Sequence, residues 1–167
     1  MNSRVGHAII YINNPDVGQV RLKIKLRSVV KLVKVIMGHK GTGKTKTLVE
    51  LVKKAINEEH GNVVCIEKDK KLTYDIPYTV RLIHASDYKI CSQEFLRGFL
   101  CGLYAGNYDI THIFIDNFFK MIGDTSCEEA ADFLEWLEVF SEEHNVKFTI
   151  SATADPVNAG DRIKKFF

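Results

Sequence analysis

The sequence lacks the features that would assign it to a membrane or a secreted class. No apolar run approaches the roughly 20 residues that a membrane-spanning helix needs. The first residues do not show the charged-then-apolar order of a secretory signal peptide. The four cysteines form no C-x-x-C pair, and no cysteine–histidine cluster has the spacing of a zinc site. We therefore expect buried free thiols, a cytoplasmic location and no membrane partner.

Acidic residues are nearly missing from the start of the chain, which makes the charge distribution uneven. Residues 1–34 hold seven of the 23 lysines and arginines but one of the 21 acidic residues. The rest of the chain is therefore mildly acidic and would repel the phosphates of a nucleic acid, so we expect no nucleic-acid partner. Residues 1–32 have three open interpretations: a β-hairpin, a weakly ordered basic leader, or a non-native segment from a misassigned start. We expect one nucleotide-binding domain at 33–167.

The most informative stretch of the sequence is 33–45. A short apolar run ends at Gly38, and the pattern G-x-x-x-x-G-K-[ST] follows, before an amphipathic helix. Glycines in the loop allow backbone conformations that point several N–H groups into one concavity. The start of the helix adds free N–H groups and the positive end of its dipole.

This arrangement suits the compact negative charge of a nucleotide polyphosphate. Lys44 would reach the β- and γ-phosphates, and the Thr45 hydroxyl would ligate Mg²⁺. The expected nucleotide-binding residues of the loop are Gly38, His39, Lys40, Gly41, Thr42, Gly43, Lys44 and Thr45.

From residue 33 onward the sequence alternates between strand and helix patterns. Strands are expected at 33–37, 62–67, 79–85, 110–116 and 146–152, with a minor strand near 72–74. Helices are expected at 44–59, 92–104 and 126–145, with a short final helix from Asp155. The alternation predicts an α/β fold, the three-layer P-loop NTPase fold, with a mainly parallel sheet of about five strands and helices on both faces.

Two details of the helices can be predicted. Phe95, Phe99 and Leu103 share one side of the second helix and are expected to face the core. Ser126 and Glu129 have the spacing of a capping box at the start of the third helix.

Asp116 is the second candidate for site chemistry, because it ends the apolar strand expected at 110–116. In a parallel sheet, ligands bind beyond the carboxyl ends of the strands. A carboxylate at that end, next to the phosphate loop, can hold Mg²⁺. The alternative is that Asp116 caps the next turn.

Several segments together resemble a known class of proteins. Residues 33–153 resemble the additional-strand class of P-loop NTPases, which includes RecA-like ATPases. More narrowly, the chain is similar to a family of small bacterial ATP-binding proteins that are sometimes labelled twitching-motility ATPases. The segments that carry this similarity are VIMGHKGTGKTKT, GNVVCIEK, GNYDITHIFID and KFTISATADP. The resemblance covers nearly all of 33–167 and none of 1–32, and it implies nucleotide binding and little more.

The resemblance also suggests which groups would handle the attacking water. Many relatives carry a glutamate directly after the aspartate, but here Asn117 stands at that position and cannot be a base. RecA-like members place the glutamate at the end of the second strand, where this chain has Glu67. Glu67 is therefore the candidate base. The alternative is that Glu67 is only a charged residue at the end of a strand, without a catalytic role. Ser151 or Thr153 would sense the γ-phosphate from the end of the last strand.

Arginine is scarce after residue 34, where only three occur. A transition-state arginine raises phosphoryl-transfer rates by roughly 10³–10⁵, and Arg162 is the candidate on position alone. Nucleoside kinases use an arginine-rich lid over the transferring phosphate. The scarcity of arginine therefore disfavours a kinase function.

We therefore expect an ATP-binding protein with slow or partner-stimulated, Mg²⁺-dependent hydrolysis, in which the catalytic residues are Lys44, Glu67 and Asp116. The nucleotide pocket would also include Thr153, and Thr45 and Asp116 would hold the metal. A non-hydrolysing nucleotide switch and a small nucleoside or nucleotide kinase are the alternatives. An unknown protein partner and an oligomer remain open.

Overall fold

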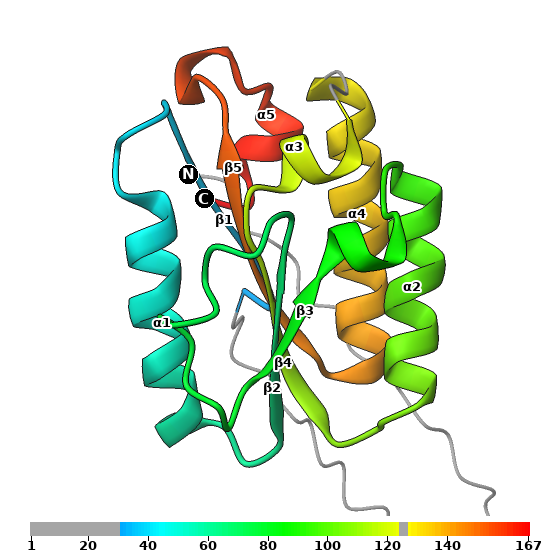
Figure 1. The fold of residues 1–167 in the computed structure, drawn as a ribbon. Coiled ribbons are helices and arrows are strands. Elements are labelled where there is room, and N and C mark those ends of the chain that lie inside the picture. The colour runs from blue at the N-terminus through cyan, green and yellow to red at the C-terminus, as the bar shows by residue number, and fades with distance from the viewer. Residues whose placement is uncertain (1–30, 124–126) are drawn as a thin grey trace, which may run out of the picture. The chain divides into compact units, whose positions relative to one another are not determined.

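The computed structural model describes residues 31–123 and 127–167. Its sheet has five parallel strands in the order β1-β5-β4-β2-β3 (Figure 1). The strands are β1 (Val33–Gly38), β2 (Asn62–Glu67), β3 (Arg81–His84), β4 (Ile110–Ile115) and β5 (Lys147–Thr153). The helices are α1 (Lys44–Glu58), α2 (Gln93–Ala105), α3 (Phe118–Ile122), α4 (Cys127–His144) and α5 (Asp161–Lys164), with 3-10 turns η1 (Ala85–Tyr88) and η2 (Pro156–Asn158).

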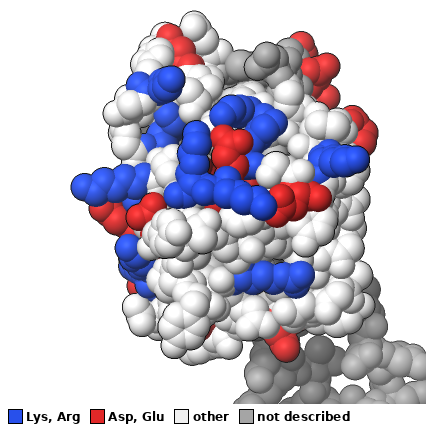
Figure 2. Space-filling model, in the orientation of Figure 1, with Lys and Arg blue, Asp and Glu red and all other residues white. Residues whose placement is uncertain are grey.

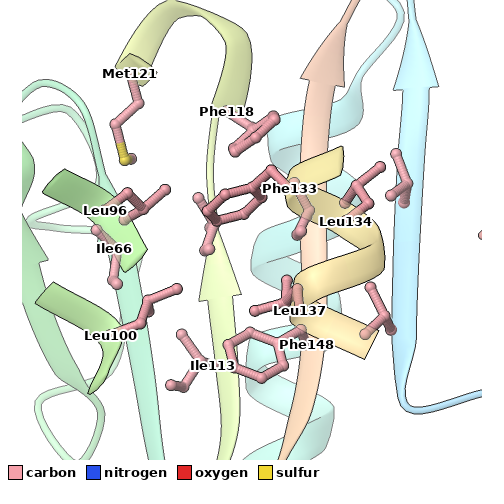
Figure 3. Close-up of a cluster of buried hydrophobic side chains, with 14 of the residues drawn as sticks. Ile66, Leu96, Leu100, Ile113, Phe118, Met121, Phe133, Leu134, Leu137 and Phe148 are labelled. Carbon is pink, nitrogen blue, oxygen red and sulfur yellow. The ribbon is translucent and has the colours of Figure 1, made fainter. Parts of the chain in front are cut away.

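Helices cover both faces of the sheet, and each face has its own apolar core. Along β2, Val63 and Cys65 belong to the core under α1, whereas Val64 and Ile66 belong to the core under α2 and α4. This alternation follows from the two-residue period of a strand. Figure 3 shows the larger core, where side chains of α2 and α4 meet those of the central strands. The predicted α/β fold with about five mainly parallel strands is confirmed.

The strand order determines what meets at the carboxyl edge of the sheet, the upper edge in Figure 1. Because all five strands are parallel, the segments that follow them emerge along this one edge. Strand β5 lies between β1 and β4 and pairs with both. The loop after β1, the residues after β4 and the end of β5 are therefore neighbours.

One secondary-structure prediction is wrong, and one short helix was missed. The expected minor strand near 72–74 does not form, because residues 68–80 make a series of turns. Leu72, Ile76 and Val80 are nevertheless buried and anchor these turns in the core under α1. The short helix α3 after β4 was not predicted.

The core-facing side of α2 was predicted correctly for Leu103 but wrongly for Phe95. Phe95 is 47% exposed, while Leu96, Leu100 and Leu103 are buried and form the stripe that faces the sheet. Phe99 is partly buried against the same core.

The remaining predictions have mixed outcomes. The strand predicted at 79–85 is limited to β3, and the final helix is divided into η2 and α5. Of the described thiols, Cys65 is buried but Cys91 and Cys101 are exposed, so burial was wrongly predicted for two of them. The hairpin proposed for 1–32 and the capping role of Ser126 fall on residues outside the described part. In the described ranges, no helix is both long and apolar enough to cross a membrane.

A partly buried cluster of charged and histidine side chains lies at the amino ends of β4 and β5, away from the glycine loop. Glu59 Oε1 lies 2.7 Å from Lys147 Nζ and 3.3 Å from His112 Nδ1. His112 Nε2 lies 3.0 Å from the Thr149 hydroxyl, and its ring stacks on Phe114. Burial lowers the pKa of His112 to about 4, with Lys147 adding to the shift and Glu59 opposing it. His112 is therefore neutral in the folded protein at pH 7.

This cluster predicts a loss of stability in mild acid. Below pH 6.5 the unfolded chain protonates His112 and the folded protein does not, so the free energy of unfolding falls as the pH drops from about 6.5 to about 4. The two pKa values limit the loss to about 3 kcal/mol. Urea unfolding at several pH values measures it. A His112→Gln variant should show a flatter dependence in that window, and an unchanged slope would contradict the assignment.

Candidate functional site

The loop between β1 and α1 has the backbone shape expected for an anion cradle. Gly41 and Gly43 have φ angles of 87° and 82°, which side-chain-bearing residues rarely adopt. Gly43 is the N-cap of α1, so the free N–H groups of the first helical turn border the loop. At Gly38, an added Cβ would lie 2.8 Å from Thr42 Oγ1, which leaves no room for a larger residue without movement. The sequence pattern and the backbone geometry therefore agree.

Lys44 begins α1 and is largely buried. Its ammonium group donates a 2.7 Å hydrogen bond to the His39 carbonyl oxygen within the same loop. Burial lowers the pKa of Lys44 from its ordinary value, and the negative charge of Asp116 opposes that shift. The side chain thus lies between the loop backbone and the carboxylate that follows β4.

Asp116 accepts hydrogen bonds from two hydroxyl groups that come from different elements. Thr45 Oγ1 lies 3.2 Å from Asp116 Oδ1 and 3.4 Å from Oδ2. Ser151 Oγ, on β5, donates to Asp116 Oδ1 at 2.6 Å. Asp116 is only 8% exposed, so these bonds compensate a carboxylate that has lost most of its water. The predicted pair Thr45 and Asp116 is therefore brought into direct contact.

Two pockets meet at this contact, and both include Thr45 and Asn117. The larger has a volume of about 350 Å³ and follows the glycine loop. It is lined by Lys40, Gly41, Gly43, Lys44, Thr45, Lys46, Asn117, Ser151 and Thr153. The smaller has a volume of about 140 Å³ and is lined by Thr45, Glu67, Lys68, Asp69, Lys71, Leu72, Asp116 and Asn117. Figure 2 shows that most charged side chains on this face lie in its upper half, near the carboxyl ends of the strands.

Asn117 has an unusual backbone conformation for a residue with a side chain. Its φ of 57° and ψ of 48° are left-handed, a region that asparagine tolerates better than most residues. The Asn117 N–H donates to Ser151 Oγ at 2.8 Å, and Thr153 Oγ1 lies 3.5 Å from Asn117 Oδ1. The turn into α3 is thereby tied to the end of β5, where both predicted γ-phosphate sensors lie.

Glu67 lines the smaller pocket and is 2% exposed. Its carboxylate accepts hydrogen bonds from the backbone N–H groups of Lys71 and Leu72 at 3.0–3.1 Å. His84 Nδ1 lies 3.1 Å from Glu67 Oε1. The carboxylate is therefore near Thr45 and Asp116 but is also a structural anchor for the turn that follows β2.

Two residues named from the sequence do not point into this site. The His39 side chain is 68% exposed and lies 3.6 Å from Asp155, although its carbonyl oxygen belongs to the loop. Arg162 binds Asp132 and Glu135 through its guanidinium group at 2.5–3.1 Å, so these carboxylates hold it against α4. The positive charge of Arg162 is thereby balanced by these two carboxylates.

Two features of the site were not predicted from the sequence. Ser151 was named as a sensor, but its direct bond to Asp116 was not predicted. Lys68 and Lys71, which line the smaller pocket, carry no motif signal. For Lys68, its position directly after a buried strand was the available clue, because such residues emerge at the carboxyl edge.

The donor set suits a magnesium ion that is shared with a ligand. Within 31–123 and 127–167, no group of three His, Cys, Asp or Glu side chains could hold a metal. Mg²⁺ in nucleotide sites, however, takes one or two protein oxygens, and phosphate oxygens and water supply the others. The Thr45 hydroxyl and the Asp116 carboxylate are such oxygens, and they already face each other.

Comparisons with models of known protein families gave no match, and a search of curated proteins gave none either. The interpretation of the site therefore rests on its own geometry.

The left-handed glycine at the start of α1 gives a test with a matched control. Gly43→Ala should destabilise the protein by about 1–2 kcal/mol, because alanine is strained at a φ of 82°. Gly98→Ala should instead stabilise it by roughly 0.5–1 kcal/mol, because Gly98 lies in α2 with open space around it. Thermal unfolding of both variants measures these effects. Two changes of the same sign would contradict the loop geometry.

Proposed function

We propose that this protein binds ATP together with Mg²⁺ in the larger pocket and hydrolyses it slowly or on stimulation by a partner. One observation carries the proposal: the Thr45 hydroxyl at the start of α1 lies 3.2 Å from the Asp116 carboxylate at the end of β4, beside Lys44 and the glycine loop. A glycine-rich turn that only reverses the chain would not be expected to contact a buried carboxylate across an intervening strand.

Each protein group has a definable role in this proposal. Backbone N–H groups of the loop and of the first turn of α1 bind phosphate oxygens. The Lys44 ammonium group would exchange its His39 carbonyl partner for a phosphate oxygen, since an ammonium group binds an anionic oxygen more strongly than a neutral carbonyl oxygen. Thr45 and Asp116 would hold Mg²⁺, which neutralises charge on the phosphates. Ser151 orients Asp116 through its 2.6 Å hydrogen bond.

Glu67 is the proposed base, and its surroundings also support the first alternative. The carboxylate lines the smaller pocket with Thr45 and Asp116, within the region where an attacking water would lie. Its oxygens, however, already accept two backbone N–H groups. If those bonds persist when nucleotide binds, the protein is a non-hydrolysing switch in which Glu67 is structural.

The kinase alternative has less support. A phosphoryl acceptor would have to occupy the smaller pocket, whose volume of about 140 Å³ suits a few water molecules better than a nucleoside. None of the described residues that line either pocket is an arginine. A phosphoryl-transfer screen with nucleosides as acceptors would reveal a kinase directly.

Nucleotide binding is tested by Lys44→Ala. The variant should bind ATP at least tenfold more weakly, a loss of about 1.4 kcal/mol or more, because one buried cation is removed. Titration calorimetry with ATP and Mg²⁺ measures the affinity, and Lys53→Ala is the control on an exposed position of the same helix. In the wild type, nucleotide at 100 times its Kd should add about 2.7 kcal/mol to the free energy of unfolding. Equal binding by Lys44→Ala and wild type would refute the proposed site.

Hydrolysis is tested separately by Glu67→Gln. If Glu67 is the base, phosphate release should fall by about 10² or more while ATP affinity is retained. Asp87→Asn is the control, because Asp87 is an acidic partner of Lys70 outside both pockets. Unchanged turnover in Glu67→Gln would remove Glu67 from the mechanism. Wild-type turnover no higher than that of Lys44→Ala would favour the switch.

A further inference from the structure

The phosphate site lacks a nearby arginine among the described residues. Arg162 is bound by two carboxylates of α4. Arg97 lies over the rings of Phe133 and Trp136, at 5.8 and 5.4 Å from their centroids. Arg81 begins β3 and lines neither pocket. Within the described residues, a cation that stabilises charge on the transferring phosphate would therefore be a lysine.

Lys68 is in a suitable place for that role. It follows the last residue of β2 and lines the smaller pocket together with Thr45, Asp116 and Asn117. Strand β2 pairs directly with β4, so Lys68 emerges beside the residues that follow β4. Its ammonium group lies 2.6 Å from the carbonyl oxygen of Lys120, in α3.

The partners of Lys68 distinguish it from the other lysines of the same turn. Lys70 pairs with Asp87 at 3.0 Å, and Lys71 pairs with Asp69 at 3.4 Å. Lys68 forms no ion pair with any carboxylate of the described residues, since its hydrogen bond goes to a neutral carbonyl oxygen. Its full positive charge is therefore available to an anion in the pocket.

Glu67 holds this turn in a fixed shape. Its buried carboxylate accepts the N–H groups of Lys71 and Leu72, which closes the chain over residues 68–71. Leu72 in turn is packed in the core under α1. The turn thereby places Lys68 at the edge of the smaller pocket before any nucleotide binds.

We propose that the Lys68 ammonium group contacts the terminal phosphate of bound ATP and stabilises its charge during transfer to water, the contribution that arginine makes in many phosphoryl-transfer enzymes. The proposal rests on the proposed function. In the reaction, the water oxygen bonds to the γ-phosphorus as the bond from that phosphorus to the bridging oxygen breaks. ADP leaves with the electron pair, inorganic phosphate keeps the water oxygen, and one proton passes to the base and then to solvent. Lys68 stays protonated throughout.

The test compares binding of ADP alone with binding of ADP, Mg²⁺ and aluminium fluoride, which imitates the transferring phosphate. Lys68→Met keeps the apolar stem of the side chain and removes its charge. Lys70→Met is the matched control two residues away, outside both pockets. Titration calorimetry should give ADP affinities within twofold of each other for wild type and both variants. The aluminium fluoride complex should bind at least tenfold more weakly to Lys68→Met, and as in wild type to Lys70→Met.

Each other outcome identifies which claim fails. If the wild type binds no nucleotide, the proposed function is wrong and the role of Lys68 fails with it. If the wild type binds ADP but gains no affinity with aluminium fluoride, or if Lys68→Met keeps the gain, only the role of Lys68 is overturned. An equal loss in Lys68→Met and Lys70→Met would indicate a general charge effect and would also overturn it. Circular dichroism of each variant verifies that the fold is intact.

Discussion

The arrangement of the site depends on one buried carboxylate, that of Asp116. A carboxylate removed from water is costly unless hydrogen bonds replace its hydration. At Asp116 these bonds come from the Thr45 hydroxyl of α1 and the Ser151 hydroxyl of β5. Three segments that are far apart in the sequence are thereby fixed to one point at the carboxyl edge of the sheet. The glycine loop has a defined position relative to β4 because this contact spans the strand between them.

The two buried acidic residues of the site, Asp116 and Glu67, are compensated by different groups, and this difference separates their roles. Asp116 is bound by hydroxyl groups, which can rotate and accept as well as donate, so they can share the carboxylate with a metal ion. Glu67 is bound by backbone N–H groups, which are fixed by the turn they belong to. A group in the first situation can take a ligand with little rearrangement. A group in the second must first give up bonds that hold the turn after β2.

The sequence predicted the parts of this molecule that follow from local rules. The glycine loop was predictable because its spacing reflects the backbone that phosphate binding needs, and Asp116 because a polar residue that ends an apolar strand lies at the carboxyl edge. The contact of Ser151 with Asp116 was not predictable, since it depends on the sheet order β1-β5-β4. A minor strand was wrongly expected near 72–74 because the N–H groups that Glu67 binds leave no pattern in the sequence.

The cations of the site are held in a way that favours an anionic ligand. Lys44 and Lys68 both donate to neutral carbonyl oxygens, at 2.7 and 2.6 Å, although carboxylates lie nearby. A phosphate oxygen carries a charge that a carbonyl oxygen lacks, so it forms the stronger bond with an ammonium group. Had either lysine formed a direct ion pair with a buried carboxylate, a ligand would have to break that pair and leave the carboxylate uncompensated. The hydroxyl bonds to Asp116 and the amide bonds to Glu67 prevent this competition. The same hydrogen bonds that keep the two carboxylates stable thus leave the two cations free for a polyphosphate.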